Sequence, residues 1–186
     1  MKLCTTLLLC ASAFAEAPAL LADLPKPPVM PLRFPDPGIA VTGPPLPAVR
    51  TIPPAFPKNL HALIQAAARK HRVPAAFIKS IVAAESNFDS SALSSRGAIG
   101  LMQLMPGTAQ QYGADPTVPE QNLDAGTCYL RVLMNRYRKY RNWMHCVIAA
   151  YNAGPAVVDR YRGVPPYPET RIYVARVLSF LRQFQR

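Results

Sequence analysis

The sequence predicts an all-α domain that follows a proline-rich segment, and three observations lead to this prediction. Downstream of residue 57, apolar residues recur every three or four positions, as they do on the buried face of a helix. No run of strand length alternates apolar and polar residues. Residues 18–57 contain thirteen prolines in forty positions and show no helical period. We therefore expect one helical domain at residues 58–186, preceded by a linker at residues 18–57.

The helix expected at residues 59–71 is amphipathic. Its apolar side chains share one face: Leu60, Leu63, Ile64 and Ala67. Basic residues occupy its last turn, where cations interact favourably with the helix dipole.

The next helix is expected at residues 74–86, because Pro74 suits a first helical turn. Its buried face is marked by Phe77, Ile78, Ile81 and Val82. Glu85 lies four residues after Ile81 and three after Val82, which places it on or beside the apolar stripe. A carboxyl group partly surrounded by apolar side chains should have a raised pKa, as a general acid near neutral pH requires. The alternative is a structural Glu that caps a turn or pairs with an arginine.

The remaining helices are expected at residues 106–113, 122–140, 144–154, 155–163 and 169–184. Pro106 should open the first of these and Gly113 should end it. The residue before a proline disfavours helix, so "LMQLM" before Pro106 should be extended or loosely coiled. Residues 114–121 are expected to form a loop.

The long helix at residues 122–140 is supported by apolar residues at helical spacing: Leu123, Leu130, Leu133, Met134 and Tyr137. Gly154 and the proline after it should separate the next two helices. The last helix is amphipathic, with Glu169 at its start, where a carboxylate suits the helix dipole.

Residues 1–17 have the pattern of a secretory signal peptide. Lys2 precedes a short apolar run, and small residues allow cleavage after Ala15 or Ala17. The run is too short to span a membrane, so we expect no transmembrane segment in the mature chain. If the chain were a lipoprotein, Cys10 would be the lipid-modified residue, but Leu9 before it is bulky for such a site. We expect an exported, periplasmic protein.

The linker at residues 18–57 should be disordered and partly extended as polyproline II, with a reach of about 120 Å. It is either a spacer or an arm without a specific role. As a spacer, its candidate partner is an envelope-spanning secretion or pilus complex.

The net charge of +11 lies almost entirely downstream of residue 57, where seventeen Lys/Arg face seven Asp/Glu. This favours an anionic partner, such as nucleic acid, acidic lipid or a carboxylate-bearing polymer. The signal peptide and an interior Glu argue against nucleic acid.

Removal of the signal peptide would leave two cysteines, Cys128 and Cys146. They either form a disulfide or are two small, buried apolar residues. In a simple helical hairpin their sulfurs would lie about 12 Å apart along the axis, beyond disulfide reach, whereas crossed helices could bring them together. His61, His71 and His145 show no metal-ligand spacing, and we expect no metal or cofactor.

Four segments together resemble the lytic transglycosylase family, of the soluble type with a goose-lysozyme-like fold. These are "ES" at 85–86, "GAIGLMQLMPGTA" from Gly97, "AAYNAGP" from Ala149 and "PYPETRIYVARV" from Pro166. They follow the family's order over about residues 58–184. The resemblance implies a lysozyme-like helical domain that acts on peptidoglycan glycan strands.

The resemblance also implies the site residues. Glu85 falls on the catalytic acid and base. The positions implied to bind the substrate are Ser94, Gln103, Met105, Tyr151, Asn152, Glu169 and Tyr173. The first three would line the sugar site, Tyr151 and Asn152 would lie beside the acid, and the last two would close the cleft. Separately, Met102 and Met105 either contact sugar or fill core, and Gly97 and Gly100 either let the backbone approach the glycan or are turn residues.

Glycanases commonly use two carboxylates, but no second one stands out here. Asp89 is in a turn that suits local capping, Asp115 and Glu120 are expected in a loop, and Asp124 and Glu169 are expected at helix starts. One acid suffices if the substrate's own 6-hydroxyl attacks, which gives 1,6-anhydromuramoyl products without water, so that the enzyme is a lyase. The alternatives are a lysozyme-like hydrolase that uses an acid such as Asp89, and a non-catalytic peptidoglycan-binding or secretion-assembly module.

Overall fold

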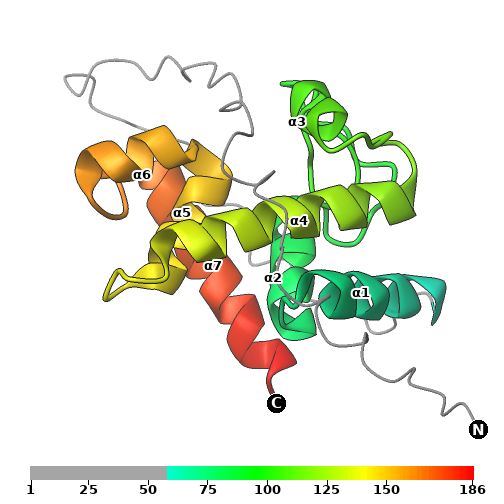
Figure 1. The fold of residues 1–186 in the computed structure, drawn as a ribbon, viewed down its shortest axis with the longest axis horizontal. Coiled ribbons are helices and arrows are strands. Elements are labelled where there is room, and N and C mark those ends of the chain that lie inside the picture. Colours follow the sequence, from blue (N-terminus) through cyan, green and yellow to red (C-terminus); the bar gives the residue numbers. More distant parts are fainter. Residues whose placement is uncertain (1–57) are drawn as a thin grey trace, which may run out of the picture.

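The computed structural model describes residues 58–186, which form seven helices (Figure 1). In chain order these are α1 (Lys58–His71), α2 (Ala75–Glu85), α3 (Pro106–Gln111), α4 (Pro119–Tyr137), α5 (Trp143–Ala153), α6 (Pro155–Tyr161) and α7 (Pro168–Phe184). Within this part of the chain the only β-type pairings are two isolated bridges, which join Leu93 to Ile99 and Ile99 to Leu104. The prediction of an all-α domain is therefore confirmed.

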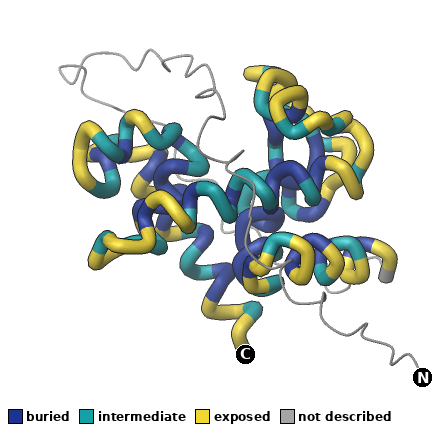
Figure 2. The backbone as a smooth tube through the Cα atoms, viewed as in Figure 1, coloured by how far each residue is buried: buried dark blue, intermediate teal, exposed yellow. Residues whose placement is uncertain are grey.

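Helix α5 forms the centre of the main core. It packs against α4, α6 and α7, while α2 packs along α7. Four consecutive residues of α5, Val147 to Ala150, are fully buried, and the small alanines allow neighbouring helices to approach closely. Figure 2 shows burial concentrated where the helices meet and exposure at the helix ends and loops.

The segment between α2 and α4 forms a smaller unit with its own core. Leu104 and Ala109 pack there against Ala125 of α4. Figure 1 shows α3 over the N-terminal end of α4, whereas α6 lies near the C-terminal end of that helix. Helix α4 therefore connects two parts of the domain.

Two predicted helix boundaries are wrong. Helix α4 begins at Pro119, inside the expected loop, because proline occupies its first turn; Glu120 is thus helical and Asp124 is not at a helix start. The same helix ends at Tyr137 and not at residue 140. The hydroxyl of the buried Tyr137 lies within hydrogen-bond distance of two acceptors, the Pro155 carbonyl oxygen at 3.1 Å and Oδ1 of Asp159 at 3.0 Å. A turn follows in which the Tyr140 amide donates to the Tyr137 carbonyl.

Cys128 and Cys146, the two cysteines within residues 58–186, are free thiols. Cys146 is buried, which fits a small apolar core residue, whereas Cys128 is half-buried. The predicted signal peptide (residues 1–17) and linker (residues 18–57) lie outside the described residues. None of the seven helices is long and apolar enough to cross a membrane.

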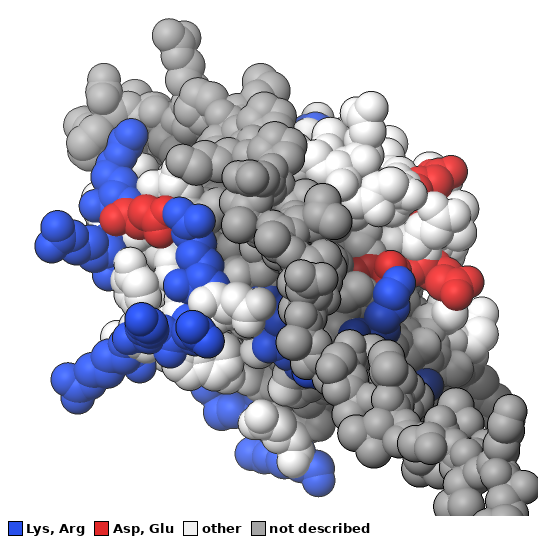
Figure 3. Space-filling model, viewed as in Figure 1, with Lys and Arg blue, Asp and Glu red and all other residues white. Residues whose placement is uncertain are grey.

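Charge is unevenly distributed over the surface. In the view of Figure 3, most of the visible Lys and Arg lie on the left, over α6, the α4–α5 turn and the C-terminal end of α7. Most of the visible Asp and Glu lie on the right of the same view.

Candidate active site

Glu85 is the last residue of α2, and the chain turns sharply after it. Asn87 and Phe88 both adopt left-handed backbone conformations, with φ values of 52° and 67°. Phe88 is buried, and its ring packs edge-on against Phe184 of α7, with the ring centroids 6.2 Å apart. This contact compensates for the unfavourable backbone and leaves Glu85, half-buried, at the point where the helix ends.

The carboxyl group of Glu85 contacts Tyr173 of α7. The Tyr173 hydroxyl donates a hydrogen bond to Oε1 of Glu85 at 2.6 Å. Burial raises the pKa of Glu85 to about 7, while the hydrogen bond from Tyr173 and the charge of Arg176 partly oppose this shift. The structure thus provides a carboxyl group that can both hold and release a proton near neutral pH.

Tyr151 of α5 is a second tyrosine near the acid. Burial, followed by the charge of Glu85, raises the pKa of Tyr151 and of Tyr173 well above the ordinary value. Both phenols therefore remain protonated and act as donors. The Tyr151 hydroxyl donates to the Met102 carbonyl at 3.0 Å. Helix α5 therefore holds the loop at residues 86–105, which follows Glu85 and connects α2 to α3.

Two further side chains hold this loop, and neither role was predicted from the sequence. The buried Ser86 hydroxyl donates to the Leu101 carbonyl at 2.9 Å. Asn122 of α4 is fully buried, and its Oδ1 accepts from the Met102 amide at 2.9 Å. Its Nδ2 donates to the carbonyls of Ile99 and Pro116 at 2.8 and 2.9 Å. In the sequence Asn122 follows Gln121 and precedes Leu123, and no local signal marked it.

Gly100 allows this close packing. Its φ is +78°, and a Cβ atom there would lie 2.5 Å from Nδ2 of Asn122 and 2.8 Å from the Pro116 carbonyl oxygen. Gly97 also has a positive φ, of +82°, but a Cβ atom there would meet nothing within 4 Å. Gly100 therefore permits contact with α4, and Gly97 is a turn glycine.

The loop carries three of the predicted sugar-site residues. Gln103 has a φ of 48°, and its Nε2 donates to the carbonyls of Ala92 and Gly100 at 3.0 Å each, which leaves Oε1 as its remaining polar atom. Ser94 Oγ accepts from the Ala98 amide at 2.9 Å. Met105 is 45% exposed, whereas Met102 is fully buried and belongs to the core. The sugar-binding roles of Ser94, Gln103 and Met105 stay predictions.

The remaining predicted residues lie on α5 and α7. Oδ1 of Asn152 accepts from the hydroxyl of Thr170, which is fully buried and was not singled out from the sequence. Glu169 is exposed in the first turn of α7, and its carboxylate lies 3.9 Å from the guanidinium of Arg96. Arg96 is on the loop that carries Ser94, so this ion pair joins that loop to α7.

Three tyrosine rings form a row that ends beside the acid. The ring centroids of Tyr112 and Tyr129 are 6.4 Å apart, and those of Tyr129 and Tyr151 are 5.5 Å apart. Tyr129 comes from α4 and Tyr112 caps the C-terminal end of α3, so the row connects the smaller unit to the centre of the domain.

Three other carboxylates are bound by hydrogen bonds or ion pairs. Oδ1 of Asp89 accepts from the Ser91 amide and hydroxyl at 2.8 and 2.6 Å, which lowers the pKa of Asp89. Asp115 is bound by Thr117 in the same way, with a lowered pKa. Asp124 lies 2.8 Å from Lys70 and 2.7 Å from His71. The local capping role predicted for Asp89 is confirmed.

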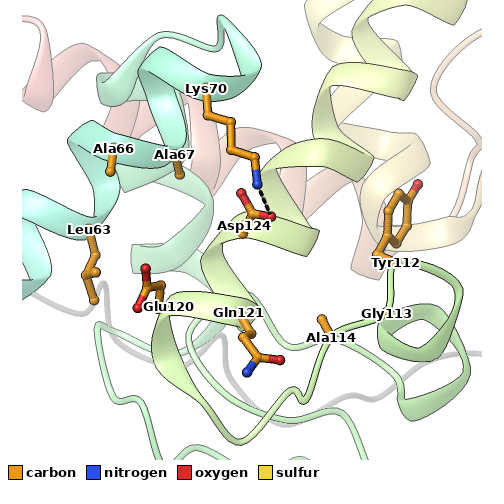
Figure 4. Close-up of a pocket in the computed structure, with 10 residues that line it drawn as sticks. All are labelled: Leu63, Ala66, Ala67, Lys70, Tyr112, Gly113, Ala114, Glu120, Gln121 and Asp124. Carbon is orange, nitrogen blue, oxygen red and sulfur yellow. Dashed lines mark hydrogen bonds and ion pairs between the residues drawn. The ribbon is translucent and has the colours of Figure 1, made fainter. Parts of the chain in front are cut away.

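A pocket of about 500 Å³ lies between α1 and the start of α4 (Figure 4). It is lined by Leu63, Ala66, Ala67, Lys70, Tyr112, Gly113, Ala114, Glu120, Gln121 and Asp124. None of the predicted site residues lines it. Residues 58–186 contain no group of three or more His, Cys, Asp and Glu side chains placed to hold a metal ion.

Comparison with known proteins gives one consistent family. Residues 62–173 match the family described as the transglycosylase SLT domain. The chain is 31% identical over 149 residues to the soluble lytic murein transglycosylase of Escherichia coli K12, covering 67% of this chain and 23% of the relative. It is 31% identical over 139 residues to the membrane-bound lytic murein transglycosylase C of Haemophilus influenzae PittEE, covering 64% of this chain and 39% of the relative.

Solved structures of lytic transglycosylases are similar to this chain. An inactive mutant of the lytic transglycosylase Slt from Pseudomonas aeruginosa aligns with a TM-score of 0.61 and 31% identity, over 69% of this chain and 24% of that one. The 70 kDa soluble lytic transglycosylase from Escherichia coli aligns with a TM-score of 0.61 and 29% identity, over 72% and 24%. The chain thus spans about a quarter to two fifths of the length of these proteins.

Proposed function

The chain belongs to the transglycosylase SLT domain family, and on this premise we propose that it is a peptidoglycan lytic transglycosylase with Glu85 as its single acid and base. The observation that carries the proposal is the contact between Glu85 and Tyr173, in a setting that raises the pKa of Glu85 to about 7. At neutral pH a substantial fraction of such carboxyl groups is protonated, and the ionised form is also accessible.

In the first step, Glu85 gives its proton to the oxygen that bridges N-acetylmuramic acid and N-acetylglucosamine. The bond from that oxygen to C1 of the muramoyl sugar breaks, and the acetamido oxygen of the same sugar bonds to C1. The Tyr173 hydroxyl and the positive charge of Arg176 stabilise the carboxylate that forms, because both lower the pKa of Glu85.

In the second step, the Glu85 carboxylate takes the proton of the muramoyl 6-hydroxyl. That oxygen then bonds to C1 and displaces the acetamido oxygen, which closes the 1,6-anhydro ring. Glu85 is protonated again, and no water is consumed. Among the described carboxylates, Asp89, Asp115 and Asp124 are bound by other residues, which supports a mechanism with one acid.

We assign the surrounding residues as follows. We propose that Gln103, Ser94 and Met105 form one wall of a substrate cleft, because two polar side chains beside an exposed apolar one suit sugar binding. Tyr151 and Asn152 line the floor, and Glu169 and Tyr173 form the opposite wall. We place the enzyme in the periplasm after export, with the linker at residues 18–57 as the candidate contact to an envelope-spanning secretion or pilus complex.

The test is to digest purified sacculi and determine the masses of the muropeptides. Products that carry a 1,6-anhydro ring are expected, and the variant Glu85→Gln should give none above background. Products that carry an added water would instead identify a lysozyme-like hydrolase. Absence of any cleavage by the folded wild-type protein would favour a non-catalytic module.

A further inference from the structure

The positive charge of the domain is concentrated in its C-terminal part. Residues 131–186 contain eleven Lys/Arg and two Asp/Glu, whereas residues 58–130 contain six and five. We call residues 131–186 the basic half. This segment covers the last part of α4 and all of α5, α6 and α7. Concentrated like charge destabilises a compact fold, so a partner that neutralises it would be bound favourably.

Most of this charge is exposed and has no carboxylate partner within the described residues. The two acids of the basic half are already engaged, because Asp159 pairs with Arg136 and Glu169 pairs with Arg96 from the other half. Exposed cations lie in the turn between α4 and α5 and at the end of α6: Arg138, Lys139, Arg141, Arg160 and Arg162. They face solvent and are available to an external anion.

The arrangement of these cations indicates the form of the anion. They come from the α4–α5 turn and the end of α6, and Figure 3 shows Lys and Arg spread over the side of the molecule where these elements lie. The pocket of Figure 4 lies in the other half, and two of its lining residues are the acids Glu120 and Asp124. A dispersed set of cations suits an extended polymer that carries repeated negative charges better than it suits a small anion.

Exposed large apolar residues occur in both halves of the domain: Leu93, Met105 and Val118 lie outside the basic half, and Tyr161 and Ile172 lie within it. Apolar exposure therefore does not distinguish a membrane from a polymer, and the choice of a cell-wall polymer rests on the position of the basic half. Helix α7 belongs both to the basic half and to the candidate active site, through Glu169 and Tyr173. A polymer bound beside Glu85 therefore also lies against one helix of the basic half.

We propose that the basic half binds the carboxylates of peptidoglycan peptide stems outside the cleft and keeps the domain on the polymer between cleavage events. The identity of the polymer rests on the proposed function, whereas binding itself does not require cleavage. The full chain carrying Glu85→Gln is therefore used to measure binding, so that the sacculi are not digested.

Co-sedimentation with purified sacculi, measured over a range of salt concentrations, tests the proposal. We compare Arg138→Gln/Arg141→Gln with the matched control Arg69→Gln/Arg72→Gln, which removes two exposed positive charges from the end of α1. At low salt the first pair should weaken binding about tenfold and the control by less than about threefold. Equal losses would show that only net charge matters and would overturn the proposal.

Two further substrates identify the anion. Sacculi whose carboxyl groups have been converted to amides should bind weakly, and undiminished binding to them would also overturn the proposal. Vesicles of anionic phospholipid should bind less tightly than sacculi; the reverse order would assign the surface to a membrane. Failure of glycan cleavage in the wild-type protein leaves these binding results unchanged, so the two proposals fail separately.

Discussion

The raised pKa of Glu85 predicts an unusual effect of pH on stability, because replacing this residue should stabilise the protein in mild alkali. The ordinary pKa of 4.5 rises to about 7 in the folded state. A carboxyl group whose pKa is raised by folding supports the folded state fully below its unfolded pKa. That support is lost as the pH rises through the folded pKa. Ionising Glu85 in the folded protein is thus the unfavourable step.

The shift of pKa corresponds to about 3 kcal/mol as an upper value, at about 1.4 kcal/mol for each pKa unit. Glu85→Gln keeps the shape of the side chain and an oxygen that can accept from Tyr173, but it never ionises. Relative to wild type, the variant should therefore gain about 2 to 3 kcal/mol of unfolding free energy between about pH 4.5 and about pH 8.5. All other titrating groups are shared and cancel in the comparison.

Urea denaturation of both proteins at the two pH values measures this difference. Glu169→Gln is the matched control, because Glu169 is exposed, and its effect should stay within about 0.5 kcal/mol at either pH. A difference between wild type and Glu85→Gln that does not change with pH would show that the fold does not hold Glu85 in its protonated form. The reasoning about its chemistry would then be wrong.

Three other substitutions test the surroundings of the acid. Tyr173→Phe removes a hydrogen bond that lowers the pKa of Glu85, so the pKa of Glu85 should rise in this variant. The alkaline limb of the pH–rate profile should then shift to higher pH, and a profile that does not shift would contradict this. Asn122→Ala removes the hydrogen-bond partner of three backbone groups and should lower the free energy of unfolding by about 2 to 4 kcal/mol in urea denaturation. A loss under about 1 kcal/mol would mean that other contacts hold the loop. Gly100→Ala should destabilise more than Gly97→Ala in thermal denaturation, because both positions have a positive φ but only Gly100 faces a clash; equal losses would contradict the role given to Gly100.

The helices could be predicted from the sequence because their signals are local. Apolar spacing, together with prolines at helix starts, located most of the elements, including the end of α2 close to Glu85. The errors in α4 come from the same kind of signal. Pro119 starts the helix earlier than expected. The helix ends at Tyr137, which contacts Pro155 at the start of α6, and apolar spacing in the sequence does not reveal this contact.

The site was less accessible, because the contacts that build it join distant parts of the chain. Glu85 and Tyr173 are 88 positions apart, and Asn122 reaches Met102 across 20 positions. No local pattern encodes such pairs. Tyr173 was identified through its resemblance to a family motif, whereas Asn122, which lies outside the four motifs, was not identified.

The mass profile of muropeptides released from sacculi tests the proposed chemistry most directly. The wild-type chain should release products that end in a 1,6-anhydromuramoyl ring, and Glu85→Gln should release none above background while remaining folded. Products with an added water at the muramoyl end, or equal release by wild type and Glu85→Gln, would contradict a mechanism in which Glu85 alone serves as acid and base.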